Sequence, residues 1–556
     1  MAVQIDQQTQ FRDAVDAVLE AYFERYPGYA AHLGFHDYDG RVTDFDPAAI
    51  SAWLGRVRDF RETLATFDRE ALSAEERLDL DVLDLALDGE IHEWEERAEW
   101  RRNPMAYLWA LDASDYLKRD YAPLALRVAA VVRLLGEVPR VLAQARANLT
   151  PPLPVTFVEM SGDMFGGTLE YLQSTLPGQV EPVGAEHPEL FAQFRAAQPR
   201  AADAVREFVA WLEALKAGAT DDFAIGRRGF ERMLWTGEAV DVPLERLLAI
   251  GQADLERNKA NFEATAKALD PGRTPAELMA ALGAKHPTAA KLVDETRAML
   301  EELRDWVIAH DIVGVPSEVR IRVEETPPFM RWAFAMMDSP GPFESKADEA
   351  FYYVTPPERD WPPEQQEEWL TKFDYATLRD VSMHEAYPGH YVHYLHSRAV
   401  ASRVRRIFGA YSFWEAWAHY VEQLMVEAGF RPDDLELRLA QLSEALLRDV
   451  RFITSIRMHT EGMTVGEATA MFREHAHMPE KPARQEAVRG TFDPGFLNYT
   501  LGKLMLLKLR DDAKAEAKAE GRPFSLRAFH DQFLSYGAPP VPLVRREMLG
   551  EVGEIL

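Results

Sequence analysis

The chain has 556 residues, of which 47% are hydrophobic and 28% are charged. This composition is typical of globular proteins and excludes disordered and fibrous classes. The 91 Asp and Glu residues outnumber the 62 Lys and Arg residues, which gives a formal net charge of −29 at pH 7. Because so much negative charge repels phosphate groups and anionic lipid headgroups, we expect neither nucleic acid nor a membrane surface among the partners.

The sequence contains no cysteine. Disulfides, catalytic thiols and thiolate metal sites are therefore excluded, and a bound metal would need His, Asp or Glu ligands. The first 20 residues do not combine a basic region with an apolar one, and no run of about 18 apolar residues occurs elsewhere. We therefore expect a cytoplasmic protein.

Helical periodicity covers most of the chain and predicts a mostly α protein. Pro275 at the first helical position and Gly283 as a stop signal delimit one helix at both ends. Since no long linker or internal repeat is present, we expect a single large α-helical domain over residues 1–556. Three pairs have a hydroxyl residue three positions before a Glu, a pattern that begins many helices: Ser73 with Glu76, Thr274 with Glu277 and Thr464 with Glu467.

Two segments interrupt the helical pattern. Residues 318–324 (EVRIRVE) alternate apolar and charged side chains, and residues 351–355 (FYYVT) are aromatic and β-branched. We expect these segments to form a small β-hairpin or an edge sheet.

Histidines gather in one stretch of the chain: five of the 15 lie between residues 384 and 419. The stretch begins His384-Glu-Ala-Tyr-Pro-Gly-His390, and a His beside a Glu with a second His close behind is typical of metallohydrolases. In such sites two imidazoles hold Zn²⁺ and the Glu takes a proton from water. We therefore interpret His384 and His390 as candidate zinc ligands and Glu385 as the candidate base.

The spacing of the two histidines needs an explanation, because they are six residues apart and the usual zinc helix has them four apart. On a regular helix, six residues place His390 roughly 120° round the axis and about 9 Å along it, too far for two ligands of one ion. Pro388 and Gly389 stand between the histidines, and this pair is suited to breaking the helical ladder. We expect the break to bring His384 and His390 together.

Residues 413–422 (FWEAWAHYVE) supply further candidates on a second helix. Glu415, His419 and Glu422 fall on one face of this helix, and aromatic and apolar residues cover the opposite face. Such a helix would supply Glu415 as the third zinc ligand and leave the fourth position to water. His419 or Glu422 would then orient a ligating imidazole.

Simpler interpretations stay open. The string at 384–390 can arise by chance on a solvated helix, and the polar residues of 413–422 can be the wet face of an amphipathic one. His390, His393 and His396 also follow one another by threes round a helix and form an alternative ligand set.

The strings HEAYPGH and EAWAHYVE resemble a bacterial family known as domain of unknown function 885 (DUF885), whose patterns are close to HExxPGHxxQ and EGWAxYxE. The opening segment, residues 25–40, is similar to that family as well, so the resemblance extends over nearly the whole chain. Three positions depart from the family pattern, because His393 and Phe496 each replace a Gln and Ala416 replaces a Gly. The family resembles, at the level of fold, the Taq-type carboxypeptidases, which are large α-helical gluzincin metallopeptidases with a deep cleft.

The resemblance implies that His384, His390 and Glu415 bind the metal and that Glu385 is the general base. On this basis we predict a zinc-dependent metallopeptidase that holds one Zn²⁺ per chain and acts on a peptide or a small amide, with carboxypeptidase action as one option. Residues 318–510 would carry the metal site and the substrate cleft, and the strands would bind an extended substrate at the sheet edge.

A later block with Arg489 and Tyr499 is similar to the family's R…PGQxxxYxxG pattern. Because related metallopeptidases stabilise an oxyanion with a late Tyr, the resemblance implies that role for Tyr499. Arg489 and Arg510 would bind a substrate carboxylate or pair with acidic side chains. We also assign His393 and Arg489 to the residues that contact either the zinc ligands or the substrate.

The competing function is a non-catalytic helical binding protein that retains a metallopeptidase-like cleft. It predicts metal or ligand binding without turnover. The sequence indicates no oligomeric state.

Overall fold

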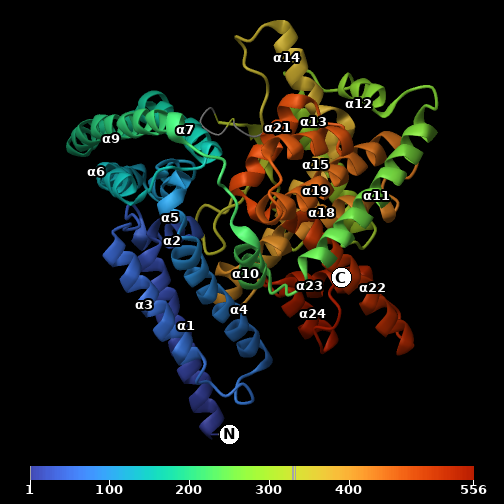
Figure 1. The fold of residues 1–556 in the computed structure, drawn as a ribbon, viewed down its shortest axis with the longest axis horizontal. Coiled ribbons are helices and arrows are strands. Elements are labelled where there is room, and N and C mark those ends of the chain that lie inside the picture. Colours follow the sequence, from blue (N-terminus) through green and yellow to red (C-terminus); the bar gives the residue numbers. More distant parts are fainter. Residues whose placement is uncertain (1, 328–330, 332–333) are drawn as a thin grey trace. The chain divides into compact units, whose positions relative to one another are not determined.

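The structure is a computed structural model that describes residues 2–327, 331 and 334–556 (Figure 1). Over these residues α-helices predominate, and the strands form one small sheet of three short strands. The fold is therefore mostly α, as the sequence predicts. A search of the described helices finds none long and apolar enough to cross a membrane.

Contacts group the chain into two compact units. Unit 1 comprises Met1–Ile225 and Pro340–Asp348, and unit 2 comprises Gly226–Ser339 and Glu349–Leu556. The prediction of one large domain over residues 1–556 stays a prediction, because the compactness of a unit does not measure whether it folds alone. All the candidate metal ligands belong to unit 2.

Unit 1 contains helices α1 to α9: α1 (Ala2–Arg25), α2 (Pro27–Leu33), α3 (Pro47–Leu64), α4 (Ala74–Ile91), α5 (Glu99–Arg102), α6 (Leu124–Asn148), α7 (Val155–Glu170), α8 (Leu176–Val180) and α9 (Pro188–Leu215). The predicted capping box begins α4. The Ser73 hydroxyl accepts a hydrogen bond from the Glu76 N–H at 3.2 Å, and the Glu76 carboxylate accepts one from the Ser73 N–H at 2.9 Å. These bonds satisfy N–H groups that a helix start otherwise leaves free.

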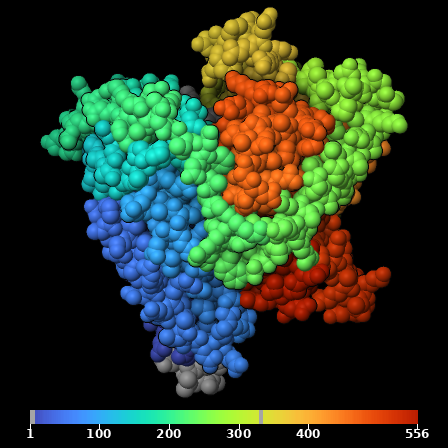
Figure 2. Space-filling model, viewed as in Figure 1, coloured from blue at the N-terminus to red at the C-terminus, as the bar shows by residue number. Residues whose placement is uncertain are grey.

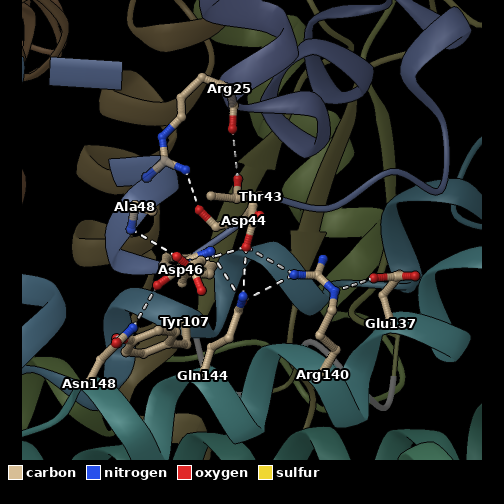
Figure 3. A network of polar contacts seen from close by, with 11 residues as sticks. Arg25, Thr43, Asp44, Asp46, Ala48, Tyr107, Glu137, Arg140, Gln144 and Asn148 are labelled. Atoms are coloured by element: carbon tan, nitrogen blue, oxygen red, sulfur yellow. Dashed lines mark hydrogen bonds and ion pairs between the residues drawn. The ribbon is translucent and has the colours of Figure 1, made fainter. Parts of the chain in front are cut away.

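Figure 3 shows a polar network that holds the turn at residues 43–46 in unit 1. Arg140 of α6 donates a hydrogen bond to the Asp44 carboxylate at 3.1 Å, and Arg25, the last residue of α1, donates to the Asp44 carbonyl. Asp46 begins α3, because its carboxylate accepts the backbone N–H two residues on, at 2.8 Å. The turn thereby connects α1, α3 and α6.

Residues 340–348 belong to unit 1 although they connect two strands of unit 2. His36 holds this segment, because its Nε2 lies 2.8 Å from the Glu344 carboxylate and its Nδ1 lies 3.1 Å from that of Asp39. Burial lowers the pKa of His36, but these two carboxylates outweigh burial and raise it. Gly341 lies so close to α2 that a Cβ would approach a carbonyl oxygen of that helix to 2.2 Å. The opening segment that carries the family resemblance thus binds residues 340–348.

Unit 2 contains helices α10 to α24: α10 (Gly226–Glu238), α11 (Leu244–Leu269), α12 (Pro275–Gly283), α13 (Leu292–Ala309), α14 (Pro363–Leu370), α15 (Tyr375–Glu385), α16 (His390–Ser397), α17 (Arg403–Ile407), α18 (Tyr411–Glu427), α19 (Leu435–Thr460), α20 (Val465–His475), α21 (Glu480–Phe492), α22 (Asn498–Ala519), α23 (Leu526–Ser535) and α24 (Val541–Leu549). The two remaining capping boxes are confirmed at the starts of α12 and α20. The helix predicted between Pro275 and Gly283 has those bounds.

Long helices form the centre of unit 2. α19 packs against α11, α18 packs along α22, and α15 contacts both α18 and α19. Every side chain from residue 448 to 456 of α19 is buried, so neighbours surround this helix rather than cover one face of it. Figure 2 shows part of the outer layer, where the green surface of α10 to α12 borders the orange surface around α20 and α21.

The sheet of unit 2 has three strands, β1 (Arg322–Glu325), β2 (Ala335–Asp338) and β3 (Phe351–Val354), in the order β1-β3-β2. The predicted small sheet is confirmed, but its pairing is not a hairpin. β1 and β3, the two segments expected from the sequence, pair in parallel, and parallel neighbours need a long connection. β2, which the sequence pattern does not indicate, pairs with β3 in the antiparallel sense. β2 is therefore an edge strand.

Candidate metal centre

The helix that carries the first histidine stops immediately after it. α15 ends at Glu385 and α16 begins at His390. The Gly389 N–H donates to the Met383 carbonyl at 2.9 Å, so the chain folds back on the end of α15. A Cβ on Gly389 would lie 1.7 Å from the His384 carbonyl oxygen, which excludes every other residue at this position. The expected break at Pro388 and Gly389 is confirmed.

Trp417 holds this turn from α18. Its indole Nε1–H donates to the Pro388 carbonyl at 2.8 Å and lies 3.3 Å from the Gly389 carbonyl. The indole is fully buried, and a buried Trp N–H needs such a partner. Trp417 therefore fixes the turn to the helix that carries the third candidate ligand.

The break brings the three predicted ligands together. Glu415 Oε2 lies 3.4 Å from His384 Nε2 and 3.6 Å from His390 Nε2, and one donor atom from each of the three residues lies within 4.8 Å of the others. Ligand atoms about 2.05 Å from a tetrahedral Zn²⁺ are about 3.4 Å apart, so the observed separations suit that ion. Glu415 Oε2 is also buried without a hydrogen-bond donor, which leaves this oxygen available to a cation.

Charges around His384 favour a cation at this point. Its Nδ1 lies 2.6 Å from Glu422 Oε1, so Nδ1–H donates to that carboxylate and Nε2 faces Glu415. Burial lowers the pKa of His384, but Glu415 and Glu422 outweigh burial and raise it to about 10. Positive charge beside Glu415 is therefore stabilised, whether a proton or a metal ion carries it.

Glu422 lies on α18 two turns beyond Glu415 and is almost fully buried. Its Oε1 also takes an ion pair from Arg448 at 3.1 Å, and its Oε2 accepts from His419 Nδ1 at 2.9 Å. Burial and the nearby Lys503 ammonium lower the pKa of His419 to about 3, so its ring is neutral and donates through Nδ1. Glu422 therefore bonds the candidate ligand His384, and His419 bonds Glu422.

Glu385 follows His384 on α15 and points to a different partner. Its Oε2 accepts a hydrogen bond from the Met337 N–H of β2 at 3.1 Å. This N–H turns away from β3, because it bonds Glu385 instead of the neighbouring strand. Glu385 is partly exposed, whereas His384 is buried. The candidate base is therefore next in sequence to a candidate ligand and bonded to an edge strand.

Tyr499 stands near the start of α22, and its ring lies nearly parallel to that of His384, with 6.4 Å between centroids and 19° between planes. Burial raises the pKa of the Tyr499 hydroxyl, and the Glu415 carboxylate raises it further. Arg489 lies close enough to hydrogen-bond this hydroxyl, and it also donates to Tyr411 at 3.2 Å. The phenol is therefore neutral and remains a hydrogen-bond donor.

Other predicted residues have partners away from this cluster. His393 is buried, and its Nε2 donates to the Gly537 carbonyl at 3.1 Å, while burial lowers its pKa to about 3. His396 Nε2 lies 2.8 Å from the Gly314 carbonyl. Among the residues that the structure describes, the nitrogens of His390, His393 and His396 do not come together as a ligand set. His393 therefore contacts the protein core rather than the ligand atoms.

The two arginines considered for a substrate carboxylate are already paired. Arg489 donates to the Asp493 carboxylate through Nε and one terminal nitrogen, at 3.0 and 2.9 Å. Arg510 lies 3.2 Å from the Tyr420 hydroxyl and 3.3 Å from the Glu427 carboxylate. Pairing with acidic side chains, one of the two predicted roles, holds for both.

Sequence reasoning missed two charged residues beside the centre, Arg448 of α19 and Asp380 of α15. Both side chains are buried. Burial and the neighbouring carboxylates of Glu422 and Glu444 raise the pKa of Asp380 well above its usual range. The sequence offers no signal for Arg448, because charged residues such as Glu444 and Arg451 surround it on the helix and favour an ordinary solvated position.

Comparison with known proteins places this chain in a family. The family described as "Bacterial protein of unknown function (DUF885)" matches residues 27–548. The chain belongs to this family. The resemblance inferred from the HEAYPGH and EAWAHYVE strings is thereby confirmed. A comparison with curated proteins finds no match.

Two solved structures are similar to this DUF885 protein over nearly their whole lengths. One, described as "a putative lipoprotein of unknown function from Shewanella oneidensis", is 25% identical and has a TM-score of 0.81, and the match covers 97% of this chain and 99% of that one. The other, described as "the putative lipoprotein from Colwellia psychrerythraea", is 17% identical with a TM-score of 0.82 and covers 98% of both chains. The second likeness shows the fold alone.

Proposed function

We propose that this DUF885 protein is a zinc-dependent metallopeptidase that hydrolyses peptide or peptide-like amide bonds. The observation that supports it most directly is the convergence of His384, His390 and Glu415 on one point. Two imidazole nitrogens and a buried carboxylate oxygen without a donor form the ligand set of many catalytic zinc sites. These three residues would hold the ion.

A Zn²⁺ ion bound there would polarise a carbonyl group and lower the pKa of a water molecule towards about 7. The remaining chemistry belongs to the side chains. Glu385 lies next in sequence to a ligand and is partly exposed, so it can take a proton from the attacking water and return it to the leaving amine. Tyr499 is a neutral donor near His384 and would hydrogen-bond the negative oxygen that develops in the transition state.

The sheet edge supports an extended peptide as substrate. Met337 presents its N–H away from β3, and alternation along the strand gives Ala335 the same orientation. An extended chain laid beside β2 would pair with these groups, as in other cases of strand addition. The Met337 N–H now bonded to Glu385 lies at the point where such a chain would meet the candidate base.

Carboxypeptidase action is the finer alternative within this proposal. It would need a cation for the free carboxylate of the substrate. Arg489 is the candidate from the sequence, but its charge is already balanced by Asp493. This pairing favours hydrolysis that does not depend on a free carboxylate.

A cytoplasmic location also belongs to the proposal. The words "putative lipoprotein" in the descriptions of two similar structures support the competing location of a lipid-anchored protein. Separation of the membrane and soluble fractions of the source cells distinguishes the two.

Metal content is the first test of the proposal. We expect protein purified without chelator to contain about one zinc ion per chain, because the three ligands already lie at suitable separations. The His390→Ala variant should retain little zinc, since two ligands rarely hold the ion against dilution. Elemental mass spectrometry of both proteins measures this difference.

Absence of zinc from the wild-type protein, even after zinc is supplied, would contradict the hydrolase and favour a non-catalytic binding protein. The Glu367→Gln variant is a suitable control. It removes a mostly exposed carboxylate that pairs with His286 and has no contact with the candidate ligands, so its zinc content should equal that of the wild type.

Loss of the Tyr499 hydroxyl tests its proposed role. We expect Tyr499→Phe to lower kcat by about 100-fold, the usual effect of removing one donor to a developing oxyanion, with KM nearly unchanged. The phenyl ring should keep its place beside His384, so zinc content should not fall. Steady-state kinetics on a peptide that the wild type cleaves provides the measurement, and an unchanged kcat would assign Tyr499 to the core.

A further inference from the structure

We propose that Arg448 is a positioning residue that ties the orientation of the ligand His384 to that of Tyr499. The inference rests on the proposed metal site and adds a residue to it. The ion pairs of Arg448 go to Glu422 and Glu444 and not to a candidate ligand. Arg448 therefore acts through its neighbours Glu422 and Tyr499.

The first connection runs through Glu422. The Arg448 guanidinium lies 3.1 Å from Glu422 Oε1, the same oxygen that accepts the His384 Nδ1–H at 2.6 Å. The Glu422 side chain is 1% exposed, so no solvent replaces a lost partner. A shift of the guanidinium would therefore move this oxygen and rotate the imidazole that it orients.

The second connection runs through the ring of Tyr499. The guanidinium carbon of Arg448 lies 5.7 Å from the centre of this ring, within the usual range for a cation above an aromatic face. The same ring lies nearly parallel to that of His384. The contacts thus form a closed cycle that runs from Arg448 through Glu422, His384 and Tyr499 back to Arg448. Each side chain in this cycle restrains the next.

The cycle needs an arginine because the side chain at this position contacts three groups that lie in different directions. One terminal nitrogen lies 3.1 Å from Glu422, and the other lies 2.7 Å from the Glu444 carboxylate. A planar guanidinium can serve both carboxylates and still present a face to the Tyr499 ring. A lysine ammonium carries the same charge but cannot hold all three positions.

A purely structural role makes a different prediction. If Arg448 only balanced the buried charge of Glu422 and Glu444, a lysine would restore metal binding once the protein had folded. A positioning role requires the planar guanidinium with its two terminal nitrogens in fixed directions, so a folded lysine variant would still bind metal poorly. Metal affinity and the geometry of the bound ion separate these cases.

The test compares Arg448→Lys with Arg451→Lys. Arg451 lies one turn away on α19, is 9% exposed, pairs with Glu486 at 2.7 Å and lies 5.2 Å from the Tyr499 ring. It is a matched control, because it has a similar burial and a contact with Tyr499, but its hydrogen bonds and ion pair go to Glu486 instead of Glu422.

We expect Arg448→Lys to weaken zinc binding by about 10-fold, the lower end of the usual effect of residues behind a metal ligand. It should also alter the visible absorption of the Co²⁺-substituted protein, which reports ligand geometry. Arg451→Lys should leave both quantities at wild-type values. Competition titration with a chromogenic chelator measures the affinity, and a pH series of the Co²⁺ spectrum completes the comparison.

Equal zinc affinity and equal spectra in the two lysine variants would overturn the inference while leaving the metal site intact. Failure of the wild type to bind zinc or Co²⁺ would instead overturn the proposed function. If Arg448→Lys does not fold, Glu444→Gln decides the question. It removes the second anchor of the guanidinium, so we expect a weaker effect in the same direction, and wild-type affinity would contradict the inference.

Discussion

Replacing Glu385 by Gln is expected to abolish most hydrolysis while leaving the metal in place. The amide has nearly the same size and its oxygen can still accept the Met337 N–H, so the local structure should persist. The amide cannot take a proton from water, and removal of a general base usually costs between about 100-fold and 10,000-fold in rate. We therefore expect kcat to fall by about 1,000-fold with one zinc still bound.

Kinetics and metal analysis on the same preparation of Glu385→Gln provide the measurement. Glu385→Asp is the matched variant, because it keeps the carboxylate but shortens its reach, and we expect an intermediate rate. A kcat within a few-fold of the wild type in the Gln variant, at full zinc content, would assign the base to another residue.

Replacing Gly389 by Ala is expected to destroy the metal site through the backbone. The added Cβ would lie 1.7 Å from the His384 carbonyl oxygen, and both groups belong to rigid backbone, so the turn must open. Opening the turn separates His384 from His390, and we expect zinc affinity to fall by more than about 100-fold. Strain of this kind typically lowers the free energy of unfolding by about 1–3 kcal/mol.

Zinc titration and thermal denaturation of Gly389→Ala measure these two effects. Gly237→Ala is the control, since a Cβ at that position of α10 meets no atom within 4 Å. There we expect unchanged zinc affinity and a slight stabilisation, because Ala restricts the unfolded chain more than Gly does. Wild-type zinc affinity in Gly389→Ala would show that the turn can move without disturbing the ligands.

The sequence could predict the candidate centre because its ligands lie in short segments. His384 and His390 are separated by a turn whose Pro and Gly break any helix, and Glu415 lies on a helix with one polar face. Each of these features depends on residues near in the chain. The same holds for the capping boxes that begin α4, α12 and α20.

Features that depend on distant parts of the chain were not predictable in the same way. β2 has the sequence AMMD, which shows neither alternation nor β-branched residues, and it is a strand because β3 is available to pair with it. The parallel pairing of β1 and β3 is likewise a matter of tertiary structure. Arg448 pairs with Glu422 from another helix, and no local sequence pattern predicts this contact.

Residues 340–348 also have a consequence for the order in which the chain is completed during synthesis. Their contacts with His36 and α2 belong to unit 1, whose other part ends at Ile225. At about 5–20 residues per second, a ribosome needs roughly 6–25 s to add the intervening stretch. Throughout that interval His36 lacks Glu344, so the amino-terminal unit reaches its final contacts only after all of α10 to α13, β1 and β2 have been made.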